Sequence, residues 1–246
     1  MATSTDKRNV RHVPHAKDAT SGSKPKDGRY IRINVGCGAS PTEGWLNFDN
    51  SMTIRIIRWP WLARFLLSSR IIDEAKCKFV MSACEARIRY ANASHHIPLP
   101  SGGVDAVYTS HMFEHLDRRE AASFLAEARR VLRPDGILRV AVPDVAKYIN
   151  KYLETGDADS FVEATGMCRP RPTGLAARLG MALTGPRNHL WMYDARSLTK
   201  ALEGAGFVDV TVLPAGRTKI SAPGWLNLVE RSHQSVYVEA VQPQCH

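Results

Sequence analysis

An apolar run that passes directly into two closely spaced glycines constrains the fold of this chain more than any other feature. Residues 30–35 are rich in β-branched and aromatic side chains and predict a buried strand, which Gly36-Cys37-Gly38 then closes. Glycines after the first strand of a parallel sheet let backbone N–H groups approach a ligand at the carboxyl edge of that sheet. The alternative for this Gly-x-Gly pair is a tight turn without a ligand.

An acidic residue ends the second predicted strand. Residues 45–48 are mostly apolar and lead to Asp49, whose carboxylate could accept both ribose hydroxyls of a nucleoside. Ten residues separate Gly38 from Asp49, whereas a dinucleotide fingerprint places its acid about 20 residues after the glycines. Pro41 occupies the place of that fingerprint's third glycine, and no P-loop follows. The spacing favours a nucleoside without a pyrophosphate, and the alternative for Asp49 is a turn residue before Ser51.

Strands and helices alternate along the rest of the chain. A helix begins at the Asp117/Glu120 capping box and stops before Pro134, and another begins at Asp194 and ends near Gly204. Further strands are predicted at residues 104–109, 137–142, 207–213 and 235–241. This alternation predicts an α/β fold with a mainly parallel sheet and helices on both faces.

The composition is that of one globular domain with a tail. Residues 1–28 are polar, mildly basic and without apolar periodicity, so they predict a disordered tail. Residues 29–246 form the domain, because no linker divides them, and they carry two inserts. One is basic and apolar, at about residues 52–89, and the other is an irregular substrate-region insert at about residues 164–189. Five cysteines without a Cys-x-x-Cys pair, and no apolar leader, predict a cytoplasmic protein.

Four stretches of the chain, taken in order and spacing, resemble a known family. They are Ile33-Asn34-Val35-Gly36-Cys37-Gly38, Gly44-Trp45-Leu46-Asn47-Phe48-Asp49, residues 97–107 and residues 130–138. The chain resembles class I S-adenosylmethionine-dependent methyltransferases, and is most similar to the compact bacterial type 11 group, some of which act on sugars or polysaccharide precursors. The resemblance covers residues 30–145 well and 194–213 more loosely. It implies a Rossmann-like, seven-stranded, mostly parallel sheet whose last two strands form an antiparallel pair.

The resemblance also implies S-adenosyl-L-methionine as the cofactor. The backbone of the glycine turn would contact its amino-acid part, Asp49 its ribose, and the residues after the third strand its adenine. The expected cofactor-binding residues are Gly36, Cys37, Gly38, Asp49, Asn92 and Ala93. The chain departs from the family pattern where Asn34, Ser40 and Asn92 replace two acids and a glycine. These replacements leave a non-catalytic binding module as an alternative.

Three residues are candidates for the acceptor side of the reaction. By the resemblance, His111 ends the fourth strand and faces the methyl group, where a neutral imidazole could deprotonate a hydroxyl. Asp144, just after the fifth strand, and His189, before the last helix, are candidates to orient the substrate. The alternative for His111 is a side chain that only lines the pocket.

A second motif overlaps this region. His111-Met112-Phe113-Glu114-His115 fits the His-x-x-Glu-His pattern of a class of zinc proteases, in which two histidines on one helical face hold Zn²⁺. The segment directly follows the fourth strand, however, where the resemblance implies a Glu-His pair that bonds the backbone or caps a helix. We therefore expect no metal, with a zinc hydrolase as the alternative.

Charge and the first insert bear on the partners. The formal net charge is +9, and residues 52–70 combine four arginines with tryptophans and leucines and contain no acid. Such a segment either packs as a lid or extra helix on the core, which we favour, or makes peripheral contact with an anionic membrane. Arginine-rich helices without interleaved stacking aromatics disfavour nucleic acid. We expect methylation of an oxygen on a small molecule or glycan precursor, the alternative being a non-catalytic membrane- or RNA-associated scaffold.

Overall fold

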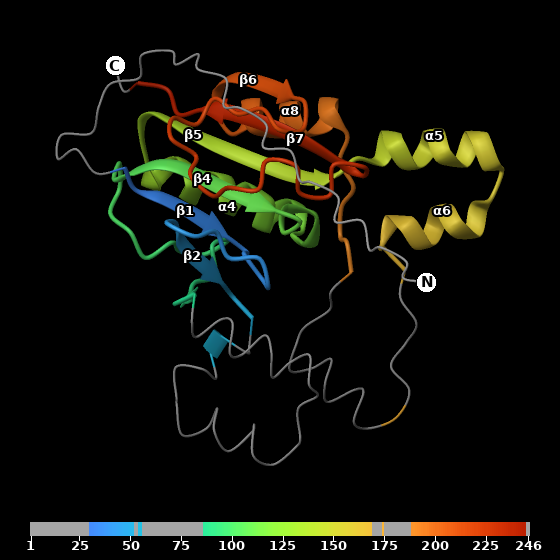
Figure 1. The fold of residues 1–246 in the computed structure, drawn as a ribbon, viewed down its shortest axis with the longest axis horizontal. Coiled ribbons are helices and arrows are strands. Elements are labelled where there is room, and N and C mark those ends of the chain that lie inside the picture. Colours follow the sequence, from blue (N-terminus) through green and yellow to red (C-terminus); the bar gives the residue numbers. More distant parts are fainter. Residues whose placement is uncertain (1–29, 52–53, 56–85, 169–173, 175–187, 245–246) are drawn as a thin grey trace, which may run out of the picture.

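The computed structural model describes residues 30–51, 54–55, 86–168, 174 and 188–244 (Figure 1). The predicted tail, most of the insert at 52–89 and much of the segment at 164–189 lie outside these residues. Within the described ranges, no helix has the length and apolarity needed to cross a bilayer.

The described chain forms a seven-stranded sheet in the order β3-β2-β1-β4-β5-β7-β6 (Figure 1). Neighbouring strands from β3 through β5 are parallel, and β7 runs antiparallel between β5 and β6. The strands are β1 (Arg32–Val35), β2 (Leu46–Asp49), β3 (Arg89–Tyr90), β4 (Val104–Ser110), β5 (Leu132–Pro143), β6 (Val208–Leu213) and β7 (Ser235–Val241). The predicted fold class, with its antiparallel last pair, is confirmed.

The helices begin where the sequence places capping residues. Asp117 accepts hydrogen bonds from the backbone of Arg119 and Glu120, and Glu120 returns one, so the predicted capping box is present. Asp194 accepts a bond from the Ser197 backbone in the same way. The described helices are the 3₁₀ turn η1 (Phe113–His115), α4 (Arg118–Val131), α5 (Val145–Thr155), α6 (Ala158–Thr165) and α8 (Ala195–Gly204).

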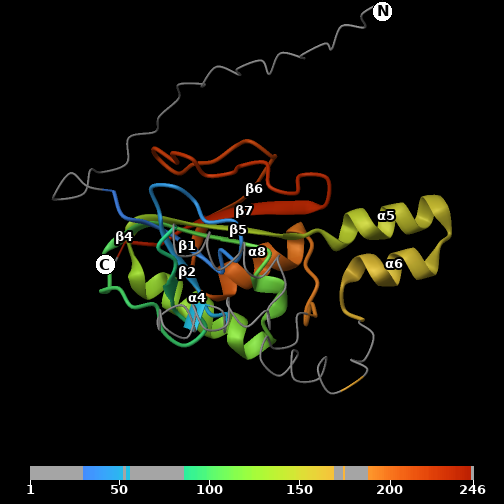
Figure 2. The ribbon, with the colours of Figure 1, turned by 60° about the horizontal axis from the view of Figure 1, so that its bottom comes forward.

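Helices α4 and α8 pack on the same face of the sheet, where Phe124, Ala128 and Leu198 join one buried cluster. The opposite face is covered by the loop at 214–234, whose Ile220 and Leu226 pack with residues of the strands in a second cluster. Figure 2 shows this loop on one side of the sheet and α4 on the other. The prediction of helices on both faces is therefore wrong for the described residues, because a loop supplies the apolar cover of the second face.

Two element boundaries also differ from the prediction. Strand β5 begins at Leu132 rather than at residue 137, because Leu132 pairs with Val104 immediately after α4 ends. The turn residues that follow stay attached to the sheet: Gly136 accepts a hydrogen bond from Gln242 N. Strand β3 pairs with β2 and takes Arg89, the last residue of the predicted insert, into the sheet.

Candidate functional site at the carboxyl edge of the sheet

The turn after β1 lies where the strand order of the sheet reverses. Chain continuation from β1 leads to β2 on one side, while β4 is the neighbour on the other side. In open α/β sheets, ligands bind outside the carboxyl ends of the strands at such a reversal. The backbone N–H groups of Gly36 and Cys37 both donate to Phe48 O, at 2.8 and 3.2 Å. The glycine turn is thereby fixed against the end of β2.

Asp49 lies directly beside this turn. Its Oδ2 accepts a hydrogen bond from Gly38 N at 2.9 Å, and its Oδ1 accepts one from Ser51 N at 2.8 Å. The side chain is largely buried, with 7% of the residue surface exposed. A carboxylate offers about four acceptor positions, so the two backbone bonds leave room for two further donors such as the vicinal hydroxyls of a ribose. The structure therefore brings together the acid and the main-chain turn that the sequence pairs.

The two glycines of the turn have different surroundings. Gly36 has a φ of +68°, and a Cβ there would lie 2.4 Å from Met112 Cγ, so Met112 packs directly on the backbone. Gly38 has a φ of +49°, and no heavy atom of the residues that the structure describes lies within 4 Å of its notional Cβ. The space over Gly38 is therefore open to a ligand that contacts the main chain.

Cys37 sits between these glycines with its thiol buried. Burial, and then the nearby charge of Asp49, raise the pKa of the thiol well above its ordinary value. A protonated thiol is a poor nucleophile, so Cys37 contributes its backbone to the edge rather than reactivity.

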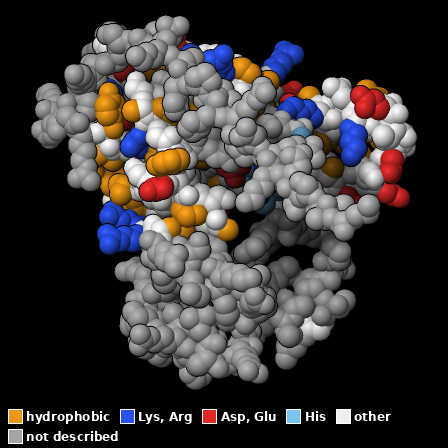
Figure 3. Space-filling view, in the orientation of Figure 1, with side chains coloured by type: hydrophobic (Ala, Val, Ile, Leu, Met, Phe, Trp, Pro, Cys, Tyr) orange, Lys and Arg blue, Asp and Glu red, His pale blue; other side chains and the backbone are white. Residues whose placement is uncertain are grey.

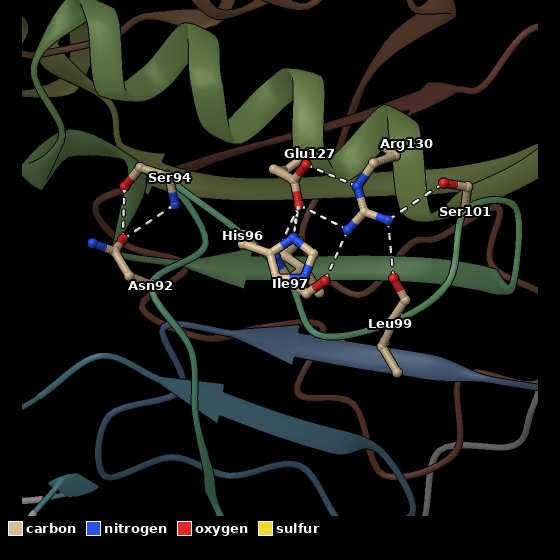
Figure 4. A network of polar contacts seen from close by, with 8 residues as sticks. All are labelled: Asn92, Ser94, His96, Ile97, Leu99, Ser101, Glu127 and Arg130. Atoms are coloured by element: carbon tan, nitrogen blue, oxygen red, sulfur yellow. Dashed lines mark hydrogen bonds and ion pairs between the residues drawn. The ribbon is translucent and has the colours of Figure 1, made fainter.

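The segment after β3 holds the residues expected near adenine. The Asn92 Oδ1 accepts hydrogen bonds from Ser94 N at 3.3 Å and Ser94 Oγ at 3.1 Å (Figure 4). Its amide nitrogen donates to no protein group among the described residues, which leaves a donor for a nitrogen acceptor on a base. Ala93 is buried in the core cluster, so its part in a ligand contact would be through the main chain.

Helix α4 fixes the segment that follows. Glu127 accepts from Ile97 N at 2.9 Å, while Arg130 donates to Ile97 O and Leu99 O and pairs with Glu127 (Figure 4). The hydrogen bond from the Arg130 guanidinium lowers the pKa of the Glu127 carboxyl, which favours the charged form of this contact. The network gives the loop after Asn92 a defined position relative to the sheet.

The departure at Asn34 has a structural explanation. Its amide nitrogen donates to Ser40 O at 3.3 Å and to Thr42 Oγ1 at 3.1 Å. An ionised acid could not donate to a carbonyl. The Asn34 amide thus stabilises the chain that follows the glycine turn. One of its two partners is the backbone oxygen of Ser40, the other residue of this stretch that departs from the family pattern.

His111 follows β4, and each of its two ring nitrogens lies close to a polar side chain. Nε2 lies 2.9 Å from Ser235 Oγ, and Nδ1 lies 3.2 Å from Glu114 Oε1. The side chain is 6% exposed, and the residue has a φ of +51°, which is uncommon outside glycine. The contact with Glu114 is within ion-pair range but lacks hydrogen-bond geometry.

Glu114 is the residue of this region that sequence reasoning placed wrongly. The resemblance implies a side chain that bonds the backbone or caps a helix. It is instead completely buried, and neither carboxylate oxygen has a hydrogen-bond partner among the described residues. Its backbone oxygen accepts from Leu190 N and Trp191 N, which ties η1 to the segment before α8. The signal in the sequence was the His-x-x-Glu-His pattern itself.

His189 reaches the same carboxylate, whereas Asp144 has a local partner. His189 Nε2 lies 3.9 Å from Glu114 Oε1, and its Nδ1 lies 2.6 Å from Thr165 O. Burial lowers the pKa of His189, outweighing the attraction of Glu114, so the imidazole is neutral at pH 7. Asp144 accepts from Ala146 N and begins α5. The structure thus joins two of the three predicted acceptor-side residues through Glu114.

A separate groove of about 740 Å³ runs between α4 and α8. Arg118, Arg129 and Lys200 are among its lining residues, and Trp191 lies at one side with its ring against the Arg118 guanidinium. None of the predicted cofactor-binding residues lines this groove. It is therefore distinct from the edge formed by the glycine turn and Asp49.

Comparison with known proteins gives one family-model match over part of the chain and a set of distant structural likenesses. A family model described as a methyltransferase domain, of type 11, matches residues 64–140, about a third of the chain. A search of curated protein sequences gives no match.

The chain is also similar to solved S-adenosylmethionine-dependent methyltransferases. One from Methanosarcina mazei is 13% identical, with 87% of this chain and 93% of that chain covered and a TM-score of 0.48. One from Archaeoglobus fulgidus is 17% identical, with 87% and 86% covered and a TM-score of 0.44. One from Thermotoga maritima is 12% identical, with 87% and 82% covered and a TM-score of 0.47.

The family match spans β3, β4, α4 and most of β5. The glycine turn and Asp49 precede it and are recognised from their geometry at the reversal of the strand order. The methyltransferase-domain match over residues 64–140 and the strand order of the sheet support a class I S-adenosylmethionine-dependent methyltransferase, a class that uses S-adenosyl-L-methionine as its cofactor.

Proposed function

We propose that this protein transfers a methyl group to an oxygen atom of a small molecule or of a sugar or polysaccharide precursor, with residues 29–246 as the catalytic domain. The observation that carries the proposal is the hydrogen bond from Gly38 N to Asp49 Oδ2. It places a carboxylate and an open stretch of main chain side by side at the carboxyl end of β1 and β2. That pairing suits a ligand with a ribose and a small charged head.

The residues of this edge would contact different parts of the cofactor. The main chain at Gly36, Cys37 and Gly38 would contact its amino-acid part, and Asp49 would accept from its ribose hydroxyls. Asn92, through its unused amide nitrogen, and the main chain of Ala93 would meet the adenine. When bound, the cofactor supplies a methyl group on a positively charged sulfur, which is already electrophilic. Alignment and exclusion of water then carry much of the rate.

On the acceptor side, a hydroxyl nucleophile must lose a proton, and His111 is proposed to accept it. The buried Glu114 carboxylate, 3.2 Å from Nδ1, would stabilise the resulting imidazolium. His111 Nε2 is hydrogen-bonded to Ser235 Oγ in this structure. The acceptor hydroxyl would therefore either displace Ser235 from Nε2 or pass its proton to His111 through the Ser235 hydroxyl. Asp144 and His189 remain candidates to orient the acceptor.

The test of the cofactor site is calorimetry of the full chain with S-adenosylmethionine and S-adenosylhomocysteine. Asp49→Ala is expected to weaken both ligands about 100-fold, because hydrogen bonds to a charged acceptor contribute about 1.5–3 kcal/mol each. Asp159→Ala, which removes an exposed carboxylate on α6, is the matched control and should bind like wild type. Equal affinity of Asp49→Ala and wild type would remove the ribose assignment.

Gly38→Ala tests the open space over the turn. The new methyl group meets no atom in the described part of the chain, so the free energy of unfolding should fall only by the cost of alanine at positive φ, about 1–2 kcal/mol. Affinity for S-adenosylmethionine should fall about 10- to 100-fold, because an extra methyl in a filled contact typically costs about 1–3 kcal/mol. A variant that binds the cofactor as tightly as wild type would place the ligand elsewhere.

The non-catalytic scaffold stays the second candidate for function. It is distinguished by binding of the full chain to anionic vesicles or RNA that weakens steeply with salt, without uptake of S-adenosylmethionine.

A further inference from the structure

Three side chains with metal-ligating atoms meet at η1, on the acceptor side of the proposed methyl transfer. Ligand atoms of Glu114, His115 and His189 all lie within 4.8 Å of one another. They come from two segments: η1, directly after β4, and the stretch before α8. The rings of His115 and His189 are in edge contact, with centroids 4.9 Å apart. Figure 3 shows histidine side chains on this face of the molecule, between the sheet and helices α5 and α6.

Backbone carbonyls hold both imidazole rings in one tautomer. His115 Nδ1 lies 3.0 Å from Asn188 O, and His189 Nδ1 lies 2.6 Å from Thr165 O. A carbonyl oxygen only accepts, so each Nδ1 must carry the proton and donate it. The lone pair of each ring is therefore on Nε2. Histidine ligands of metals are commonly oriented by such a bond from the other ring nitrogen to a carbonyl.

The third group is a carboxylate that lacks any compensating donor. Glu114 is fully buried and neither of its oxygens receives a hydrogen bond from the described residues. An isolated buried carboxylate is strongly disfavoured unless a cation or a proton compensates it. His189 Nε2 lies 3.9 Å from Glu114 Oε1, beyond hydrogen-bond distance, so this ring does not donate to the carboxylate. His111, the other nearby ring, is not aligned for a hydrogen bond with the carboxylate.

We propose that Glu114, His115 and His189 form a binding site for a divalent transition metal, with Zn²⁺ as the ion it suits best. Two imidazole nitrogens and one carboxylate oxygen are a ligand set that Zn²⁺ takes, with a fourth position open to water or an acceptor oxygen. Metal–nitrogen distances of about 2.0–2.1 Å place tetrahedral ligand atoms about 3.3 Å apart, so the side chains close by roughly 1.5 Å at most. This replaces the sequence-based expectation of no metal.

The site differs from the one that the His-x-x-Glu-His pattern implies. In that pattern His111 and His115 are the ligands on one helix, with the glutamate as base. In the structure the second histidine is His189, and Glu114 becomes a ligand. Glu114 Oε1 is the oxygen in contact with both His111 Nδ1, at 3.2 Å, and His189 Nε2, at 3.9 Å, so the metal and His111 would share this carboxylate while His111 itself stays outside the ligand set. The metal would cross-link η1, which follows β4, to the segment before α8.

The inference is tested on the full chain with the metals alone. After removal of metal with a chelator, Zn²⁺ is titrated against a chromophoric competitor, and Co²⁺ is added as a spectroscopic probe. One equivalent is expected, with a cobalt spectrum free of thiolate absorption. His115→Ala and His189→Ala should each weaken Zn²⁺ binding by at least about 100-fold, beyond the roughly 10- to 100-fold loss typical of outer-shell changes. Bound Zn²⁺ should raise the melting temperature of wild type but not of these variants.

Three controls separate this site from other binding. Glu114→Gln keeps the shape of the side chain and should also lose Zn²⁺ if its circular dichroism is that of wild type. His95→Ala removes an exposed histidine outside the site and should bind like wild type, as should His12→Ala/His15→Ala in the tail. S-adenosylmethionine binding, measured in the same preparations, should persist without metal, so its loss would count against the cofactor site instead. The metal site would be overturned if the wild-type protein bound no stoichiometric Zn²⁺. It would also be overturned if the His115 and His189 variants bound Zn²⁺ as tightly as wild type.

Discussion

Replacement of Gly36 by alanine is expected to lower the free energy of unfolding by about 2–5 kcal/mol. Alanine at the φ of +68° observed here costs about 1–2 kcal/mol relative to glycine. The new Cβ would also lie 2.4 Å from Met112 Cγ and 2.7 Å from Met112 Cβ, and overpacking of this kind adds about 1–3 kcal/mol. Urea unfolding followed by circular dichroism gives the free energy of unfolding directly. Affinity for S-adenosylmethionine should fall in parallel, since the turn that binds it is displaced.

A matched variant separates the two contributions to this loss. Gly156, at the end of α5, has almost the same φ, +69°, but its notional Cβ has no heavy atom within 4 Å in the described ranges. Gly156→Ala should therefore lose only the conformational part and should bind S-adenosylmethionine normally. Adding Met112→Ala to Gly36→Ala should recover part of the packing penalty. If Gly36→Ala and Gly156→Ala were equally stable, the close packing of Met112 on the turn would be refuted.

Glu239→Ala is expected to destabilise the fold by about 3–5 kcal/mol, because it leaves a buried guanidinium without its counter-charge. Arg139 on β5 and Glu239 on β7 face each other, with Nη1 and Oε1 2.7 Å apart and both side chains almost fully buried. Glu239 also accepts from Thr218 Oγ1 and Lys219 N, so the loop that covers this face of the sheet loses an anchor as well. The measurement is again urea unfolding with the slope compared between variants.

The buried pair predicts a characteristic pattern among its variants. Arg139→Met/Glu239→Leu removes both charges together, and replacing a buried pair with apolar residues is often neutral or stabilising. This double variant should therefore be considerably more stable than Glu239→Ala alone. Glu154→Ala, at an exposed site on α5, should stay within about 0.5 kcal/mol of wild type. A loss below about 1 kcal/mol in Glu239→Ala would mean that Arg139 finds another partner or reaches water.

Local patterns in the sequence determined most of the sheet and the cofactor edge. The runs at β1, β2, β4, β6 and β7 have the composition of buried strands, and the capping boxes at Asp117 and Asp194 mark two helix starts. Asp49 follows Gly38 after only ten residues, which leaves room for a short connection and the strand β2 between them. Each of these signals depends on residues close together in the chain, which is why they can be read without coordinates.

The residue pattern predicts none of β3, α5 and α6, because these elements lack such a signal. Strand β3 has two residues, too few to show a period of two. Helix α5 has no buried residue, and it pairs with α6 through contacts such as that between the rings of Tyr152 and Phe161. The two helices project beyond the end of β5 (Figure 1). Packing against the sheet therefore does not determine the spacing of their apolar side chains.

What only the tertiary structure decided is the meeting of Glu114, His115 and His189. The contact between His115 and Asn188 joins positions 73 apart in the chain, and no local spacing specifies such a pair. The sequence pattern pointed to His111 as the partner histidine because it lies four positions from His115. The structure substitutes His189, because the Glu114 carbonyl binds the backbone of the segment before α8. Local chemistry determined the strands, the glycine turn and its acid, whereas long-range packing decided which histidines face the buried carboxylate.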